Sequence, residues 1–85
     1  MATVTLRAPL KQRAGTSSLE VTGATVRETL SSLESDVPAL KGWVLDDQGR
    51  IRRHVNVFVN GEPATPDDAV ADQDRVDIIH AISGG

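Results

Sequence analysis

The run Val55-Asn56-Val57-Phe58-Val59-Asn60-Gly61-Glu62 decides the fold, because it predicts a β-strand that ends in a tight turn. Valine occupies every second position, and alternation of this kind places one set of side chains on each face of a sheet. The dipeptide Asn60-Gly61 is a strong signal for a two-residue hairpin turn. We therefore expect a strand over residues 53–60 whose valines face a core and whose Phe58 faces the opposite side.

Three other segments alternate polar and apolar residues in the same way and complete the predicted sheet. They are residues 3–7, 18–22 and 75–82. The first two are expected to pair as a hairpin with a long polar connection. Pro63 and Pro66 allow only a brief, irregular strand after the turn, because proline cannot donate a ladder hydrogen bond.

One amphipathic helix is expected between the second and third strands. Thr25 and Glu28 have the spacing of a capping box, which marks a helix N-terminus. The apolar residues that follow fall on a single helical stripe and are Val26, Leu30, Leu33 and Val37. Pro38 should end the helix. A second short helical turn is expected within residues 39–45, and a tight turn at residues 46–49.

These elements predict an α+β domain in which one main helix packs on one face of a mixed sheet of four to five strands. The chain of 85 residues is short enough to be a single domain. Trp43 and Phe58 are its only aromatic residues, so the core is expected to be aliphatic. A domain of this size buries only about 60% of its surface on folding, which leaves little apolar material to line a deep catalytic pocket.

Composition excludes several functional classes. The net charge of −3 argues against nucleic-acid binding, which needs clustered Lys and Arg. No apolar run approaches the roughly 20 residues of a membrane span, and the N-terminus lacks a signal-peptide core, so we expect a cytoplasmic protein without a membrane partner. The chain has no cysteine, which removes disulfides and thiolate chemistry. His54 and His80 lie on separate strands without further ligands, so no metal site is expected.

Three stretches are distinctive together: the strand and turn over residues 55–62, the run Ala71-Asp72-Gln73-Asp74-Arg75-Val76, and the ending Ala81-Ile82-Ser83-Gly84-Gly85. In combination they resemble the ThiS/MoaD family of β-grasp sulfur carriers, which are relatives of ubiquitin. The usual family run before the last strand is closer to Asp-Gly-Asp-Glu-Val, and here Gln73 and Arg75 replace the Gly and the Glu. The usual ending is Val-Ala-Gly-Gly or Val-Thr-Gly-Gly, and here Ile82-Ser83 replace its first two residues.

The resemblance implies that the chain is a co-substrate and not an enzyme. In this family an adenylating enzyme uses Mg-ATP to join the C-terminal carboxylate, here that of Gly85, to AMP. Sulfur then displaces AMP, and the resulting thiocarboxylate donates sulfide inside a partner synthase. A sulfurtransferase or a C-terminal-processing protease is a further candidate partner. No bound cofactor is expected, because Mg-ATP belongs to the activating enzyme.

The C-terminal segment is expected to be a flexible tail, residues 83–85, that follows a folded domain over residues 1–82. Gly84 and Gly85 have no Cβ, so the backbone can pass through a narrow channel, and Ser83 belongs to the same threading segment. Because the chain has no thiol, a sulfur atom carried by it would have to be held at the carboxyl terminus.

Apolar side chains on the sheet face opposite the helix are candidates for a partner interface. Ile82 adjoins the tail, and Phe58 and Ile79 have the opposite parity to the core residues of their strands. The alternative is that they are ordinary exposed apolar residues or are covered by a loop. Arg50, Arg52 and Arg53 form a small basic cluster, which either meets an acidic partner or is a solvated strand entrance.

Two other functions remain open at this point. One is a ubiquitin-like modifier that forms isopeptide bonds to lysines through Gly85, and the other is a β-grasp binding module whose tail is inert. Among sulfur carriers, the run over residues 53–60 most resembles the cysteine-synthesis carriers of actinobacteria. Carriers for molybdopterin, thiamin and sulfur-containing natural products are the other candidates.

Overall fold

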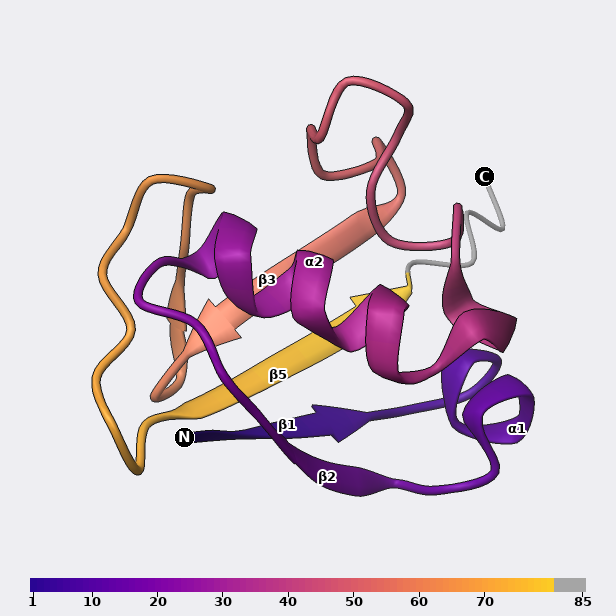
Figure 1. Ribbon diagram of the computed structural model, residues 1–85, viewed down its shortest axis with the longest axis horizontal. Coiled ribbons are helices and arrows are strands. Elements are labelled where there is room, and N and C mark those ends of the chain that lie inside the picture. The colour runs from indigo at the N-terminus through magenta and orange to yellow at the C-terminus, as the bar shows by residue number, and fades with distance from the viewer. Residues whose placement is uncertain (81–85) are drawn as a thin grey trace.

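The framework of the structure is a five-stranded mixed sheet, and the computed structural model describes residues 1–80. The strand order is β2-β1-β5-β3-β4 (Figure 1). The strands are β1 (Ala2–Leu6), β2 (Ser18–Val21), β3 (Val55–Val59), β4 (Glu62–Pro63) and β5 (Arg75–His80). The central strands β1 and β5 are parallel, and every other neighbouring pair is antiparallel. This arrangement confirms the predicted mixed sheet and the predicted hairpin of its first two strands.

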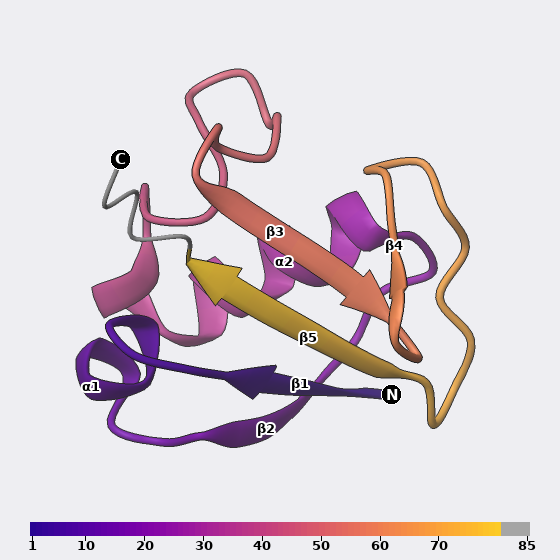
Figure 2. The same ribbon diagram turned by 180° about the vertical axis from the view of Figure 1, so that it is seen from behind.

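The main helix, α2 (Val26–Asp36), lies across one face of the sheet (Figures 1 and 2). The backbone N–H of Glu28 donates to Oγ1 of Thr25 over 3.2 Å, as a capping box requires. The return bond differs from the expected one, because Oε1 of Glu28 accepts from the N–H of Ala24 at 3.0 Å and not from that of Thr25. The helix ends at Asp36, two residues before Pro38, as predicted.

The core between the helix and the sheet is built from aliphatic side chains, as the composition predicted. Among residues 1–80 the buried apolar residues are Ala2, Val4, Leu6, Leu10, Val21, Val26, Leu30, Leu33, Leu40, Val44, Leu45, Val55, Val57, Val70, Val76 and Ile78. Full burial of one Val or Leu side chain contributes about 1.5–3 kcal/mol, so this cluster dominates the stability of the domain. Both aromatic residues are only half-buried.

Two short helical elements lie at the end of the sheet where β1 and β5 stop. Helix α1 (Leu10–Ala14) occupies the connection that was expected to be an irregular polar loop. Leu10 is fully buried, and Gly15 ends the helix in the left-handed region at φ 76°, with its N–H bonded to the carbonyl of Lys11. The 3₁₀ turn η1 (Pro38–Leu40) begins one residue before the predicted range. No helix within residues 1–80 has the length and apolar character to cross a membrane.

The turns that set strand register contain three residues with positive φ. Asn60 and Gly61 have φ values of 52° and 87°, and Val59 pairs with Glu62 across them, which confirms the predicted two-residue turn. Gln73 has φ 73° in the turn before β5. Its N–H donates to the carbonyl of Met1 over 2.8 Å, so this strained turn also fixes the start of β1.

Candidate functional site

The predicted tail residues Ile82, Ser83, Gly84 and Gly85 lie outside the described residues, so the structure defines the place from which they continue. That place is His80, the last residue of β5. His80 pairs with Val55 at the beginning of β3, and Ile78 pairs with Leu6 at the end of β1. His80 therefore lies on the central strand, at the end of the sheet where β1 and β5 stop and β3 begins. We call this the tail end (Figures 1 and 2).

Trp43 and Arg13 form an aromatic and cationic pair beside His80. The ring centroids of Trp43 and His80 are 6.1 Å apart at an angle of 51°. The guanidinium of Arg13 lies over the Trp43 ring at 4.2 Å, a cation–π geometry, and its Nε donates to the carbonyl of Ala39 over 3.1 Å. Nδ1 of His80 is buried and has no hydrogen-bond partner among residues 1–80. The last described residue of the chain thus lies beside Trp43, whose ring is in turn contacted by Arg13 from α1.

The segment that carries Trp43 is held in place from the helix. Oε2 of Glu34, near the end of α2, accepts hydrogen bonds from the backbone N–H groups of Val44 and Leu45 at 3.1 and 2.9 Å. Val44 and Leu45 are themselves buried in the core. The position of Trp43 therefore depends on the packed helix and not on the exposed loop that follows.

A depression of about 370 Å³ opens at the tail end. It is lined by Gly42, Trp43, Asp46, Ile51, Arg52, Arg53, His54 and His80. Its carboxylate is already engaged, because Asp46 binds the N–H groups of Gln48 and Arg50 and the guanidinium of Arg50. The bond from the Arg50 N–H, with these others, lowers the pKa of Asp46 although desolvation opposes the shift. The depression therefore offers cationic and aromatic groups and no free carboxylate.

The two histidines come closer together than the sequence indicated. His54 precedes β3, His80 ends β5, and both line the same depression because these strands are neighbours. Within residues 1–80 no group of three or more His, Cys, Asp or Glu side chains is placed to hold a metal ion. Two imidazoles without a third ligand offer a polar surface and no zinc centre.

The predicted interface residues Phe58 and Ile79 share the sheet face that points away from α2. Phe58 pairs with Asp77, and Ile79 pairs with Asn56, so the two apolar side chains occupy diagonal positions. Both are half-buried, whereas Phe58 was expected to face solvent openly. Asp77 lies opposite Phe58 on this face and accepts a hydrogen bond from the hydroxyl of Thr5 of β1. Their role in binding stays a prediction.

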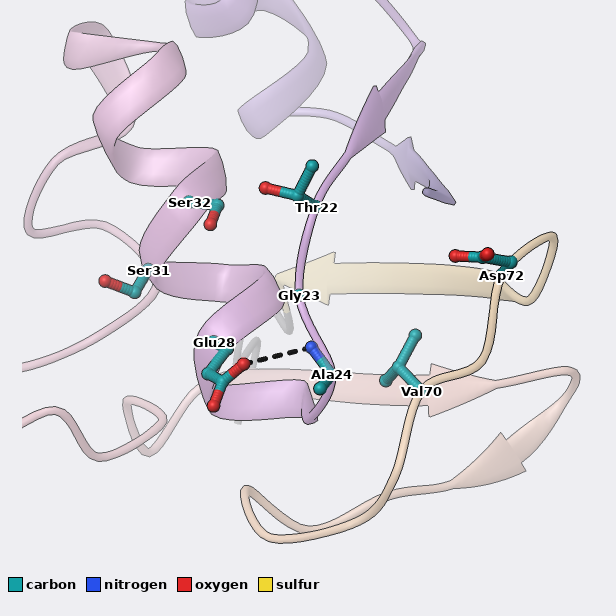
Figure 3. A pocket seen from close by; sticks show the side chains of 8 residues that line it. All are labelled: Thr22, Gly23, Ala24, Glu28, Ser31, Ser32, Val70 and Asp72. Atoms are coloured by element: carbon teal, nitrogen blue, oxygen red, sulfur yellow. Dashed lines mark hydrogen bonds between the residues drawn. The ribbon is translucent and has the colours of Figure 1, made fainter.

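A larger depression, of about 580 Å³, lies away from the tail end, at the beginning of α2 (Figure 3). It is lined by Thr22, Gly23, Ala24, Glu28, Ser31, Ser32, Val70 and Asp72. Both of its carboxylates have structural tasks. Glu28 completes the helix cap, and Asp72 forms an ion pair with the N-terminal ammonium of Met1 at 2.7 Å. It therefore contains no free acid–base group.

Sequence reasoning missed helix α1 and the position of Arg13 beside Trp43, because it treated the connection between the first two strands as a polar loop. The missed signal is local: Leu10 and Ala14 are four residues apart, and Gly15 follows at the position of a helix C-cap. Trp43 packs only partly against the core, and Arg13 and His80 lie beside its ring.

Comparison with known proteins identifies the family. The model of the ThiS family matches residues 4–85. The chain is 36% identical to small archaeal modifier protein 1 of Haloferax volcanii over 94% of its own length and 95% of that protein. It is 32% identical to the sulfur carrier protein CysO of Mycobacterium tuberculosis, covering 84% and 83% of the two chains.

Solved structures agree with the sequence comparisons. The crystal structure of the Haloferax volcanii modifier superposes with a TM-score of 0.86 at 36% identity, covering 99% of this chain and 98% of that one. A chain in the BexX/CysO complex of Amycolatopsis orientalis gives 0.87 at 30% identity over the whole of both chains. These relatives are named as protein modifiers and sulfur carriers, which agrees with the expectation that this chain is a carrier or modifier and not itself an enzyme. The chain belongs to the ThiS family, the ubiquitin-like sulfur carriers and protein modifiers that share the β-grasp fold.

Proposed function

We propose that this protein is a sulfur carrier whose working group is the carboxylate of Gly85. The observation that carries the proposal is that the family match runs from residue 4 through Gly85 and so includes the Gly84-Gly85 pair. The identity to CysO proteins, named as sulfur carriers, favours the same activity. In this scheme residues 1–82 form the docking domain and residues 83–85 the tail that enters the partner enzyme.

The reaction needs two substitutions, the first at the α-phosphorus of ATP and the second at the carbonyl carbon of Gly85. A carboxylate oxygen of Gly85 attacks the α-phosphorus of Mg-ATP in the activating enzyme, and pyrophosphate leaves. Hydrosulfide then attacks the carbonyl carbon of the acyl-adenylate, the C–O bond to AMP breaks, and a thiocarboxylate remains. Glycine suits this chemistry because no side chain stands beside the carbonyl under attack. The chain contributes the acyl group, and the partner enzyme contributes the nucleotide, the metal and the catalytic groups.

The folded domain supplies the binding energy that the tail lacks. Ordering a chain of glycines costs conformational entropy, so affinity has to come from contacts made by the rest of the protein. The central position of β5 supports this, because its neighbours β1 and β3 fix the point from which the tail departs. We place the reaction in the cytoplasm. A synthase accepts the sulfur, and a sulfurtransferase or a C-terminal-processing protease is a further candidate partner.

The acceptor pathway that we favour is cysteine synthesis. CysO proteins are the named sulfur carriers among the relatives. The Amycolatopsis orientalis relative is seen in a complex with BexX, which supports docking of such a carrier on a second protein. Molybdopterin, thiamin and sulfur-containing natural products are the other destinations, and they would use the same thiocarboxylate.

A second function, protein modification, is supported by the identity of 36% to small archaeal modifier protein 1. A modifier would use the same activated Gly85 carbonyl, with a lysine amine in place of hydrosulfide as the attacking nucleophile. The two functions therefore share the first step and differ in the acceptor.

The test is the intact mass of the protein after incubation with Mg-ATP, the adenylating enzyme of the same genome and sulfide. We expect the mass change for replacement of one oxygen by sulfur, and fragmentation should place it on Gly85. The matched control lacks Gly84 and Gly85 and should remain unchanged. Purification from the native host also shows whether the mature chain ends at Gly85. An unchanged wild-type mass with an active enzyme, together with lysine conjugates in cell extract, would reject the carrier in favour of the modifier.

A further inference from the structure

The charge of this protein is divided unevenly between two regions. Residues 7–14, which follow β1, and residues 34–54, which lead from the end of α2 to β3, contain seven of the nine Lys and Arg residues but only four of the twelve Asp and Glu residues. This region carries a formal charge of +3, and the rest of the chain carries −6, which together give the net charge of −3. The negative total therefore hides a cationic region around the point where the tail departs.

The pairing of these charges is equally uneven. Of the two arginines elsewhere in the chain, Arg27 binds Asp67 at 2.6 Å and Arg75 binds Asp77 at 3.2 Å. At the tail end Arg50 binds Asp46 at 3.0 Å. Six other cations there have no carboxylate within ion-pair distance among residues 1–80, namely Arg7, Lys11, Arg13, Lys41, Arg52 and Arg53. All unpaired Lys and Arg side chains of the described chain thus lie at the end that a partner must approach.

These six side chains are also exposed, and the segments that carry them lie at the end of the sheet where β5 stops at His80. Arg7, Lys11 and Arg13 follow β1 and lie on or before α1, and Arg13 reaches Trp43. Arg52 and Arg53 lie before β3 and line the depression that His80 also lines. The segments that carry these residues lie at the same end of the sheet, the tail end (Figures 1 and 2). We call these six residues the cationic collar.

We propose that the cationic collar is a docking surface for an acidic protein surface, namely a carboxylate-rich rim around the channel of the adenylating enzyme that receives Gly85. This inference rests on the proposed function, because that function defines the partner. Exposed charges add little affinity individually, but a one-signed region steers encounter and orients the approaching molecule. Here the orientation matters, because only the collar end of the carrier presents the tail. The acidic region elsewhere would be repelled by the same rim, which disfavours docking in the reverse orientation.

The test compares two double variants that remove the same amount of charge. Arg52→Gln/Arg53→Gln removes two collar charges, and Arg27→Gln/Arg75→Gln removes the two arginines outside it. Adenylation is followed as pyrophosphate release against carrier concentration at several salt concentrations. We expect the collar variant to raise KM about tenfold at low salt with little change in kcat, and the control to leave both unchanged. At about 1 M salt, where the Debye length is near 3 Å, the collar variant and the wild type should converge.

Each result has a distinct meaning. If the wild type is not adenylated at any salt concentration by an enzyme that is active on another carrier, the proposed function is rejected together with this partner. If the wild type is adenylated and the two double variants have equal KM values, only the role of the collar is rejected. Fluorescence anisotropy with a labelled single-stranded oligonucleotide tests a different occupant. If the wild type and the control variant bind the oligonucleotide tightly and the collar variant does not, the surface binds nucleic acid and the proposal is overturned. Thermal melts should show that both variants stay folded under the assay conditions, because all four positions are exposed and the exposed ion pairs lost in the control contribute only about 0–1 kcal/mol each.

Discussion

The two ends of this domain use polar side chains in opposite ways. At the far end, formed by residues 22–28 and 60–74 with Met1, carboxylates are bound to backbone N–H groups and to cations of the same chain. At the tail end most cations have no partner within the described chain. Bonds within the chain stabilise the fold, whereas exposed unpaired charges are hydrated and remain available for ion pairs with another molecule. The comparison therefore separates an end whose charged groups are mostly paired within the chain from an end whose cations are available to the partner that we propose.

The largest expected effect tests this separation at the tail. Appending one residue after Gly85, or replacing Gly85 by Val, should abolish adenylation, because the carboxylate is displaced or a side chain blocks the channel. The melting temperature should stay within the error of the wild type, since residues 1–80 keep all their contacts. Pyrophosphate release and circular dichroism measure the two quantities. A normal rate of adenylation in either variant would remove Gly85 from the mechanism.

The next effect is expected at the far end and should change stability alone. A Cβ built on Gly23 would stand 2.5 Å from the backbone nitrogen of Thr29 and 2.7 Å from its Cα. Thr29 is fully buried, and its hydroxyl donates to the carbonyl of Thr25, so the helix cannot move away freely. We expect Gly23→Ala to lower the free energy of unfolding by about 1–3 kcal/mol, measured by urea denaturation.

The matched control for this substitution is Gly42→Ala at the tail end. Gly42 has φ 84°, and no atom lies within 4 Å of the position that a Cβ would take, so only the backbone conformation is unfavourable. Its cost should be about 1–2 kcal/mol, that of a left-handed residue with a side chain. Equal losses at both positions, with no structural shift of α2, would show that Gly23 is needed for its backbone freedom and not for the close approach to Thr29.

The contrast between the ends also explains which features the sequence could predict. The alternation in residues 55–59 and the stripe of Val26, Leu30 and Leu33 were sufficient for β3 and α2, because burial imposes these periods directly. The Asn60-Gly61 turn was predictable because few residues adopt its positive φ values. The fold class followed from the order of these elements.

The surroundings of the tail could not be predicted in the same way. The approach of Arg13, Trp43 and His80 joins three segments that are distant in sequence, and no local pattern encodes it. The cationic collar was equally hidden, because its members are dispersed and the net charge is negative. Of the collar, the sequence indicated only a small cluster at residues 50–53. Local patterns thus predict elements, whereas the composition of a surface depends on how the elements are assembled.

A smaller effect is expected from a turn at the far end that departs from the family pattern. Gln73 has φ 73°, at the position where the usual family run has glycine. A residue with a Cβ is strained in this region by about 1–2 kcal/mol, and glycine is not, although glycine gains entropy in the unfolded chain. We expect Gln73→Gly to raise the free energy of unfolding by about 1 kcal/mol without changing adenylation. Lower stability would mean that the Gln73 side chain makes a contribution that outweighs the strain.

The smallest effect should be a dependence of stability on pH that arises at the far end. The side-chain amide of Asn60 donates to Asp74 over 3.0 Å, and the N–H of Ala71 donates to its other oxygen over 2.8 Å. The bond from Asn60, followed by that from Ala71, lowers the pKa of Asp74 below its usual value of 3.8. A carboxyl group with a lowered folded-state pKa stabilises the fold above its unfolded-state pKa, and this stabilisation is lost as the pH falls through the folded-state value.

The free energy of unfolding of the wild type should fall below about pH 4, where Asp74 becomes protonated. Asp74→Asn should be less stable than the wild type at pH 7, but its free energy of unfolding should fall less on acidification. Urea midpoints measured between pH 7 and pH 3 give both quantities. Glu62→Gln is the control, because Glu62 is an exposed carboxylate of the same end without an ion pair among the described residues. If the two variants respond alike to acid, the bonds around Asp74 do not set the stability of the far end. The acid response would then be a general property of the negative surface outside the collar.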